Sequence, residues 1–243
     1  MAAERQPDRF FLLYRALGKV DIGAPVSVKV RSCAINIDYL LSVQEYLFLE
    51  SAADLATTRS IVEIGAGFGR TCHAMLALVA GIERYTIVDL PNVLELSRRV
   101  LSLAVPQHFH KLRFLDAADT EAWRGLTADL AINIDSFQEM PPATIDTYMK
   151  GLVAQCGRFY VKNPIAKYDP ACIGIAVEDP ARFLDVFSLG YCREVIDIFD
   201  DEALEVCRRK YVEAYRPGSS WTVVAERPAD LFSYYHHVLY RSA

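Results

Sequence analysis

The chain has 243 residues and a net charge of −5, and 52% of its residues are hydrophobic and 23% charged. This length and composition are typical of one globular domain with additions. The acidic balance and the lack of a large basic cluster argue against a nucleic-acid partner and favour a small-molecule substrate. No stretch approaches the length of a membrane span and no secretory signal is apparent, so we expect a cytoplasmic protein without a membrane partner.

The six cysteines are scattered along the chain. They form no C-x-x-C pair, and no histidine follows them at the spacing of a zinc site. We therefore expect reduced thiols, mostly in the core, and no structural zinc.

After residue 60, short runs rich in Ile and Val alternate with longer segments of helical spacing. This alternation is typical of βαβ units and predicts a Rossmann-like, doubly wound α/β sheet. Seven strands are expected, at 60–65, 85–90, 111–116, 129–135, 158–163, 193–199 and 221–227. Helices are expected at about 69–80, 91–105, 119–124, 141–155 and 178–188.

The two ends of the chain depart from this alternation. The last two predicted strands are separated by a helix-like stretch and a turn, so we expect them to form a long antiparallel hairpin with one strand reversed. The tail 229–243 is expected to add a helix with an aromatic face. In residues 1–59, apolar side chains recur at helical spacing, which predicts a helical cap over the acceptor side of the sheet domain, 60–243.

The strongest local motif is IVEIGAGFGR at 61–70, in which a buried strand leads into Gly65, Gly67 and Gly69 before a helix. Glycines allow a sharp turn and a close approach of the backbone to a ligand. A dinucleotide-binding loop has the spacing G-x-G-x-x-G, whereas here the third glycine comes one residue early and Arg70 follows. By itself the loop is also compatible with a structural turn that binds nothing.

Acidic residues end the next two predicted strands. Asp89 lies at about the separation from Gly65 at which a carboxylate meets the ribose hydroxyls of a nucleotide. Taken by itself, an aspartate here would more often cap a helix, because Pro91 follows at a helix start. Asp116 could accept a hydrogen bond from an adenine amino group beside Ala117, or act as a cap.

Three acidic strand ends around one glycine loop resemble the class I S-adenosylmethionine-dependent methyltransferases, over about residues 60–227. The resemblance implies S-adenosylmethionine as cofactor and S-adenosylhomocysteine as product. In that family the first acid and the loop hold the methionine end, the second acid holds ribose, and the third lies by adenine. The cofactor-binding residues implied here are Glu63, Gly65, Ala66, Gly67, Asp89, Leu90, Asp116, Ala117 and Asn133.

Within the class, the runs EIGAGFGR, IVDLP and INIDSFQEM are most similar to the sugar O-methyltransferases. This resemblance implies O-methylation of a sugar or aminocyclitol unit in antibiotic biosynthesis. O-methyltransferases with such caps are often dimers, so a homodimer is a further expectation.

The fourth predicted strand ends in a group of polar residues, and ligands of open α/β sheets bind beyond the carboxyl ends of strands. Methyl transfer is an in-line displacement, and a positioned base adds on the order of 10²- to 10⁴-fold to its rate. Gln138 stands where many small-molecule O-methyltransferases carry a histidine base, so Asp135 and Glu139 are the candidate bases. Ser136, Gln138 and Tyr39 of the cap are expected to contact the acceptor.

Several alternatives remain open from the sequence. A histidine, from His110, His236 or His237, could serve as the base instead. Two carboxylates near hydroxyl groups could hold Mg²⁺, although no repeated acidic ligand set is present, and no metal is expected. The rival functions are an N-methyltransferase acting on an amino sugar, an NAD(P)-dependent oxidoreductase, and a binding protein that has lost catalysis.

Overall fold

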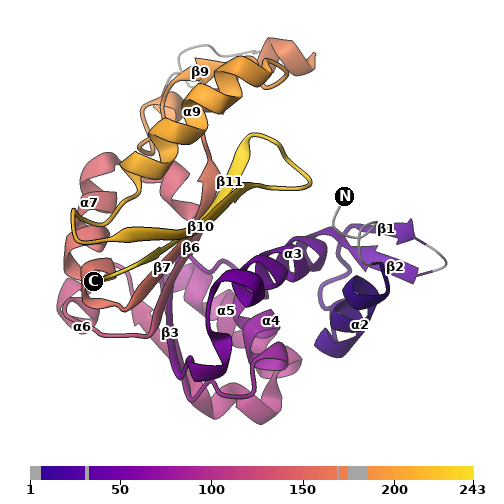
Figure 1. The fold of residues 1–243 in the computed structure, drawn as a ribbon. Coiled ribbons are helices and arrows are strands. Elements are labelled where there is room, and N and C mark those ends of the chain that lie inside the picture. The colour runs from indigo at the N-terminus through magenta and orange to yellow at the C-terminus, as the bar shows by residue number, and fades with distance from the viewer. Residues whose placement is uncertain (1–6, 31–32, 169, 175–184) are drawn as a thin grey trace. The chain divides into compact units, whose positions relative to one another are not determined.

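The computed structural model describes residues 7–168 except 31–32, together with 170–174 and 185–243. Its central feature is a seven-stranded sheet of order β10-β11-β7-β6-β3-β4-β5 (Figure 1). The pairs β3/β4, β4/β5 and β6/β7 are parallel, whereas β11 runs antiparallel to both β7 and β10. The predicted seven-stranded, mostly parallel sheet with one reversed strand is therefore confirmed. Its strands are β3 (Ser60–Ile64), β4 (Arg84–Asp89), β5 (Leu112–Asp116), β6 (Leu130–Ile134), β7 (Arg158–Pro164), β10 (Thr222–Pro228) and β11 (Tyr235–Arg241).

The prediction for the C-terminal part of the sheet was wrong in two places. The stretch 193–199 supplies only the short β9 (Val195–Ile196), which pairs with β8 (Lys167–Tyr168) in a separate parallel ribbon. The reversed strand is instead β11, within the tail that was expected to be a helix, and the antiparallel hairpin is β10/β11. Five consecutive residues of β11 are buried. A strand buried on both faces has no alternating pattern, so periodicity could not separate it from a buried helix.

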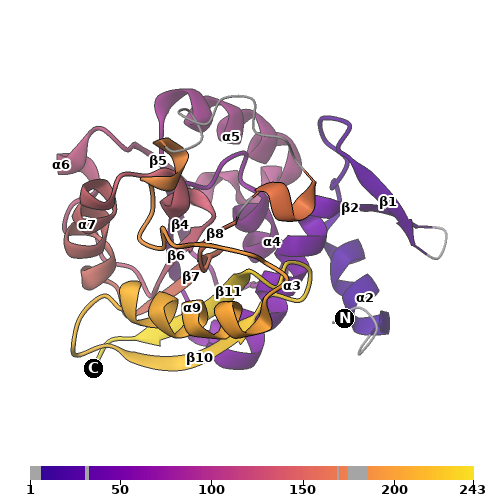
Figure 2. The same cartoon turned by 90° about the horizontal axis from the view of Figure 1, so that it is seen from above.

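Most predicted helices are confirmed. They are α4 (Arg70–Leu78), α5 (Pro91–Ala104), α6 (Thr120–Trp123), and α7 (Pro142–Gly151), which is followed by η4 (Val153–Gln155). The helix predicted at 178–188 lies mostly outside the described residues. The helix-like stretch before β10 is α9 (Asp201–Ala214), which lies beside β10 and β11 in Figures 1 and 2. It packs there through the Tyr240 hydroxyl, which donates to the carbonyl of Val212 at 2.6 Å. The other short helices are η1 (Leu55–Thr57), η2 (Pro106–Lys111), η3 (Ser136–Glu139) and η5 (Pro170–Ile173).

The chain divides into two compact units, residues 1–123 with 128–130 and residues 124–127 with 131–243. The first unit contains β3, β4 and β5 together with the N-terminal elements. The second contains β6, β7, β10 and β11. The boundary predicted at residue 60 stays a prediction.

The N-terminal elements of the first unit are α2 (Pro7–Leu17), the hairpin β1 (Ser27–Val30) and β2 (Cys33–Asn36), and α3 (Ile37–Ala52). The helix expected around Tyr39 is thus confirmed, whereas the hairpin was not predicted. Asn36 caps α3, since its Oδ1 accepts from the Asp38 N–H at 2.9 Å. An apolar core joins α2, β2, α3 and α4.

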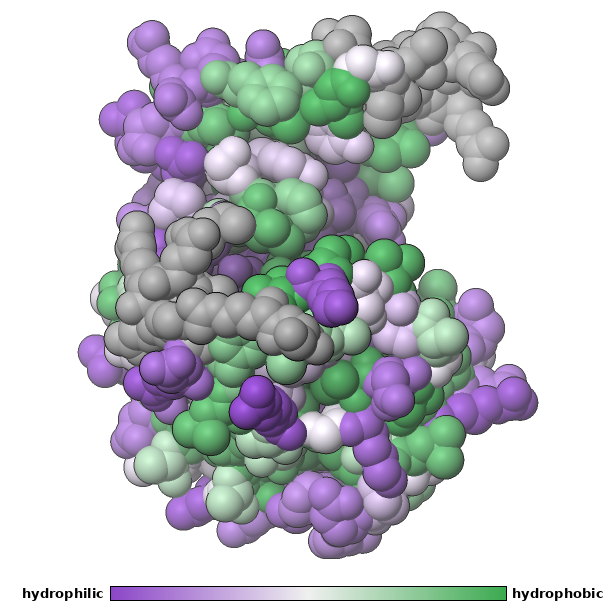
Figure 3. All heavy atoms as spheres, turned by 90° about the vertical axis from the view of Figure 1, so that its right-hand side faces the viewer, coloured by the Kyte–Doolittle hydropathy of each residue, from purple (hydrophilic) through white to green (hydrophobic). Residues whose placement is uncertain are grey.

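In the part of the chain that the structure describes, no helix is both long enough and apolar enough to cross a membrane. Hydrophilic residues lie among hydrophobic ones over the face shown in Figure 3. All six cysteines are free, and three of them, Cys72, Cys156 and Cys207, are buried.

Candidate functional site

The loop after β3 has a backbone that only glycine adopts readily. Gly65, Gly67 and Gly69 have φ of 71°, 59° and 94°, all in the left-handed region that costs other residues free energy. At Gly69, which caps α4, an added Cβ would lie 2.8 Å from Leu101 Cδ1. At Gly67 an added Cβ would meet nothing within 4 Å. The loop is therefore tightly packed where it enters α4 and open at its middle glycine.

Asp89, at the end of β4, holds this loop from the adjacent strand. Its Oδ2 accepts from the Gly67 N–H at 3.0 Å, and its Oδ1 accepts from the Leu90 N–H at 2.8 Å. Burial raises the pKa of this carboxyl, while the N–H groups of Leu90, Gly67 and Ala66 lower it. A carboxylate offers roughly four acceptor sites, so Asp89 can hold the loop and still accept from a ligand hydroxyl.

Asp116 ends β5 directly beside Asp89, because the two residues are register partners of a parallel pair. The Ala117 N–H donates to the Asp89 carbonyl at 2.9 Å, and Asp116 Oδ1 accepts from the Ala118 N–H at 2.8 Å. Leu90 is 56% exposed, which leaves an apolar side chain next to the two acids. The first unit thus brings together the predicted loop, ribose and adenine residues.

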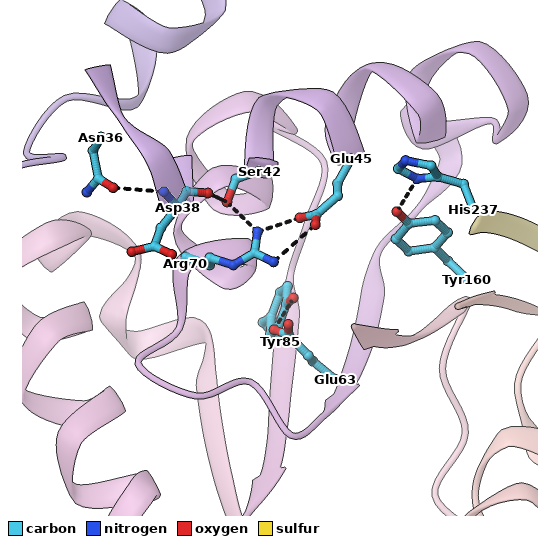
Figure 4. Close-up of polar contacts among 9 residues, drawn as sticks. All are labelled: Asn36, Asp38, Ser42, Glu45, Glu63, Arg70, Tyr85, Tyr160 and His237. Carbon is cyan, nitrogen blue, oxygen red and sulfur yellow. Dashed lines mark hydrogen bonds and ion pairs between the residues drawn. The ribbon is translucent and has the colours of Figure 1, made fainter. Parts of the chain in front are cut away.

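Glu63 lies one residue before the end of β3 and is buried. Its Oε2 accepts from the Tyr85 hydroxyl at 2.7 Å, as Figure 4 shows. Burial raises the pKa of Glu63 from 4.5 to about 7, against the lowering effects of the Tyr85 hydrogen bond and the Arg70 charge. Near neutral pH this carboxyl is therefore poised between its two protonation states.

The raised pKa of Glu63 gives a prediction for stability against pH. The folded state binds the Glu63 proton more tightly than the unfolded state does. The stabilisation of the folded state by this proton is therefore fully present below pH 4.5 and is lost as pH rises through about 7. The loss is on the order of 3 kcal/mol of the free energy of unfolding. Glu63→Gln removes this titration. In denaturant unfolding, the free energy of unfolding of the variant should therefore rise relative to that of the wild type as the pH increases across this window. Parallel curves for the two proteins would refute the assignment, and Glu121→Gln on α6 is the exposed control.

An ion pair that was not predicted from the sequence joins α3 to the first residue of α4, directly after the glycine loop. Arg70, the first residue of α4, donates from Nη1 to Glu45 Oε2 at 2.6 Å and from Nη2 to Glu45 Oε1 at 3.0 Å (Figure 4). The Ser42 hydroxyl also accepts from Nη1 at 3.0 Å. The Glu45 side chain is 1% exposed, so loss of the Arg70 charge would leave a buried carboxylate without its ion-pair partner. The two residues lie 25 positions apart in the chain, and no local motif links them.

Tyr39, predicted to contact the acceptor, lies in the apolar core of the first unit. Its hydroxyl donates to His73 Nδ1 at 2.7 Å, because His73 Nε2 donates to the Leu17 carbonyl at 2.9 Å and burial lowers the pKa of His73. The Tyr39 ring meets the Phe68 ring of the glycine loop edge-on, with centroids 6.3 Å apart. Its role toward an acceptor stays a prediction.

In the second unit, Asn133 belongs to a buried chain of amides at the end of β6. Asn133 Nδ2 donates to the Ser136 hydroxyl at 2.6 Å, and Asn133 Oδ1 accepts from Asn163 Nδ2 at 2.8 Å. The Asn163 N–H donates in turn to the Tyr211 hydroxyl at 2.8 Å. Asn163 was not predicted as a site residue, although it is a polar residue near the end of the apolar strand β7.

Asp135 has a strained backbone, with φ 65° and ψ −30°. A residue other than glycine pays on the order of 1–3 kcal/mol for such a conformation, and strain of this kind clusters at functional sites. The Asp135 N–H donates to the Lys162 carbonyl at 3.0 Å, and Oδ1 accepts from Gln138 Nε2 at 3.1 Å. Two predicted acceptor-side residues are therefore in direct contact.

A cavity of about 470 Å³ opens beside these residues within the second unit. This volume lies in the range of small-molecule sites, about 300–1,000 Å³. Burial and the Asp135 charge raise the pKa of Glu139, and the Lys167 charge lowers it. A larger hollow of about 690 Å³ along α7 contains none of the predicted site residues. The cavity lining that concerns the chemistry is Gln138, Glu139, Lys167, Tyr168, Tyr234 and Tyr235.

The histidines considered as alternative bases lie elsewhere. His236 and His237 are buried in β11, where His236 Nε2 contacts Glu226 Oε2 at 2.9 Å and His237 Nδ1 contacts the Tyr160 hydroxyl at 2.7 Å (Figure 4 shows the second pair). His110 is exposed at the end of η2. Across the described ranges, no three His, Cys, Asp or Glu side chains are grouped so that they could hold a metal ion.

Comparison with family models and with curated proteins gives no match. Solved structures do match in fold. The mitomycin 7-O-methyltransferase MmcR has a TM-score of 0.55 at 18% identity, covering 99% of this chain and 59% of that one. The methyltransferase domain of bacterial CtHen1-CN has a TM-score of 0.53 at 17% identity, covering 83% of this chain and 99% of that one.

A third match is the N,N-8-amino-8-demethyl-D-riboflavin dimethyltransferase RosA of Streptomyces davawensis, with a TM-score of 0.50 at 13% identity, covering 85% of this chain and 57% of that one. The chain thus spans about three-fifths of the length of MmcR and RosA. At these identities the likeness concerns the fold. The three structures named above are methyltransferases, and this chain has the mixed α/β sheet of their fold.

Proposed function

We propose that the chain is an S-adenosylmethionine-dependent methyltransferase that transfers a methyl group to a hydroxyl of a small acceptor. The observation that carries the proposal is the hydrogen bond by which Asp89 holds the glycine loop. A left-handed loop, open at Gly67, is held by a carboxylate that keeps acceptor capacity for a ribose hydroxyl. The fold of the matched methyltransferases supports it.

The residues of the first unit fit the cofactor. In the proposal, Glu63 and the loop of Gly65, Ala66 and Gly67 hold the methionine end. Asp89 and Asp116 then hold ribose and adenine, with Leu90 and Ala117 against the base. Glu63, whose pKa is raised to about 7, would ionise beside the cationic amino group of the ligand. For Asn133, the cofactor-binding role that the sequence resemblance implies stays a prediction. When bound, S-adenosylmethionine supplies an electrophilic methyl group on its sulfonium.

On the acceptor side, we assign the base to Glu139 or Asp135. The raised pKa of Glu139 brings this carboxyl closer to neutrality, which suits proton abstraction near neutral pH. Gln138, held by Asp135, and Ser136 would orient the acceptor. The resemblance to sugar O-methyltransferases suggests a sugar or aminocyclitol unit from antibiotic biosynthesis as this acceptor.

Methylation of an amine is the second candidate function, because a neutral amine needs less help from a base than an alcohol. The match to RosA, which is named as a dimethyltransferase of an amino group, favours keeping it. An NAD(P)-dependent oxidoreductase is disfavoured by the early third glycine of the loop.

A thermal-shift experiment tests the cofactor. A ligand that binds only the folded state raises the melting temperature in proportion to the logarithm of its concentration above Kd. S-adenosylhomocysteine should raise the melting temperature by several degrees at saturating concentration, and NAD at the same concentration should not. A shift with NAD alone would replace the proposal by the oxidoreductase.

A further inference from the structure

The cavity of the second unit has an aromatic wall. Tyr168, Tyr234 and Tyr235 line it, with ring centroids 5.7 Å apart for Tyr168 and Tyr234 and 5.1 Å apart for Tyr234 and Tyr235. The wall continues with the apolar side chains of Val186 and Leu189. Flat aromatic faces of this kind pack well against another aromatic ring.

Two cations lie at this wall, and Lys162 Nζ already stands 5.5 Å over the Tyr235 ring. Lys167, on β8, lines the cavity although only 8% of its surface is exposed. Burial lowers the pKa of its ammonium, while the Glu139 charge raises it. A buried cation of this kind is costly unless it is paired or hydrogen-bonded.

The ammonium of Lys167 is only partly satisfied. It has three N–H donors, and one of them reaches the Gln138 carbonyl at 3.1 Å. Among the described residues, Lys167 forms no ion pair and no second hydrogen bond. Glu139, the other charged residue of this lining, is exposed to solvent and forms no ion pair with Lys167. Within the described ranges, two donors of the ammonium therefore have no protein acceptor. The cavity therefore offers two charge-assisted hydrogen bonds to a ligand.

We propose that the acceptor of this enzyme is an aromatic hydroxy compound carrying a carboxylate, which Lys167 binds while the tyrosines pack on the ring. The inference rests on the proposed function and narrows it, and it departs from the sugar suggested by the sequence resemblance. The carboxylate satisfies the two free donors of the ammonium. The hydroxyl lies toward the Glu139 side of the cavity, where a carboxylate can take its proton.

The test uses three probes titrated into the full chain and followed by calorimetry. Protocatechuate carries a ring and a carboxylate, its neutral amide carries the ring alone, and glucuronate carries a carboxylate without an aromatic ring. Protocatechuate should bind about tenfold or more tightly than its amide, since one charge-assisted hydrogen bond lost corresponds to about a tenfold change in Kd. It should also bind more tightly than glucuronate, which lacks the ring that the tyrosines contact. Equal binding of the amide overturns the role of the cation, and equal binding of glucuronate overturns the role of the rings. No binding of any probe overturns the proposal.

Variants then assign the preference to Lys167. Lys167→Met should abolish the difference between protocatechuate and its amide, and Lys167→Arg should restore part of it. Lys150→Met, at a lysine whose side chain is 80% exposed on α7, is the matched control and should keep the full preference. An unchanged preference for protocatechuate over its amide in Lys167→Met contradicts the proposal. If that variant does not fold, the binding of the three probes to the wild-type chain still tests the proposal. Binding of S-adenosylhomocysteine, measured separately, reports on the proposed function independently of these probes.

Discussion

Replacement of Asp89 by alanine is expected to weaken S-adenosylhomocysteine binding about a hundredfold. The carboxylate both positions the Gly67 N–H and, in the proposed complex, accepts from the ribose hydroxyls. Two charge-assisted hydrogen bonds lost at roughly 1.5 kcal/mol each correspond to about a hundredfold in Kd. Calorimetric titration of the variant gives the value directly.

The matched control for this substitution is Asp129→Ala. Asp129 Oδ2 also accepts two backbone N–H bonds, from Arg59 and Ser60 at 2.8 Å each, at the beginning of β3 rather than at its loop. Its loss should lower the melting temperature and leave the affinity for S-adenosylhomocysteine within about twofold of the wild type once folded protein is compared. Equal loss of affinity in both variants would mean that Asp89 acts through folding alone.

The second large effect concerns the acceptor-side carboxylates. If Glu139 is the base, Glu139→Gln should lower kcat on the order of a hundredfold while the affinity for S-adenosylhomocysteine is unchanged. The deprotonated form is the base, so the wild-type rate should rise with pH through the raised pKa of Glu139 and then level off. That rising limb should be missing in the variant.

Asp135→Asn separates the two carboxylates. A positioning role through Gln138 predicts a smaller loss of kcat that keeps the wild-type pH profile. Glu202→Gln, in the first turn of α9, is the exposed control and should match the wild type. Full turnover in both Glu139→Gln and Asp135→Asn would place the base elsewhere.

The sheet from β3 to β7 could be predicted because each strand is a short apolar run followed by a helix with a clear start, such as Pro91 or Pro142. The reversed strand β11 could not be predicted, because it is buried along most of its length and its sequence, which includes two adjacent histidines, does not alternate between polar and apolar residues. The stretch 193–199 looked like a strand from its Val and Ile residues. In the structure only Val195 and Ile196 form a strand, in the ribbon with β8.

The grouping of the predicted cofactor residues followed from topology, since carboxyl ends of neighbouring parallel strands meet at one edge of a sheet. Asp89 and Asp116 are accordingly register partners. The bonds that Asp89 makes to the loop could not be read from the sequence, because they depend on the left-handed turn at Gly67.

On the acceptor side, the polar residues after β6 were identified, whereas Lys167 and the tyrosines were not. Lys167 follows β7 without any motif, and Tyr234 and Tyr235 were interpreted as part of a helix. Their common cavity exists only because β11 returns antiparallel beside β7, which brings the beginning of one strand to the end of the other. A long-range pairing of this kind has no signature in local periodicity.

The central claim is that an adenosyl sulfonium cofactor binds along the loop after β3. Calorimetric titration of S-adenosylhomocysteine into the wild-type chain tests it most directly. The account predicts saturable heat with one ligand bound per chain, reduced strongly by Asp89→Ala. A titration of folded protein that gives no heat with this ligand or with S-adenosylmethionine would contradict it.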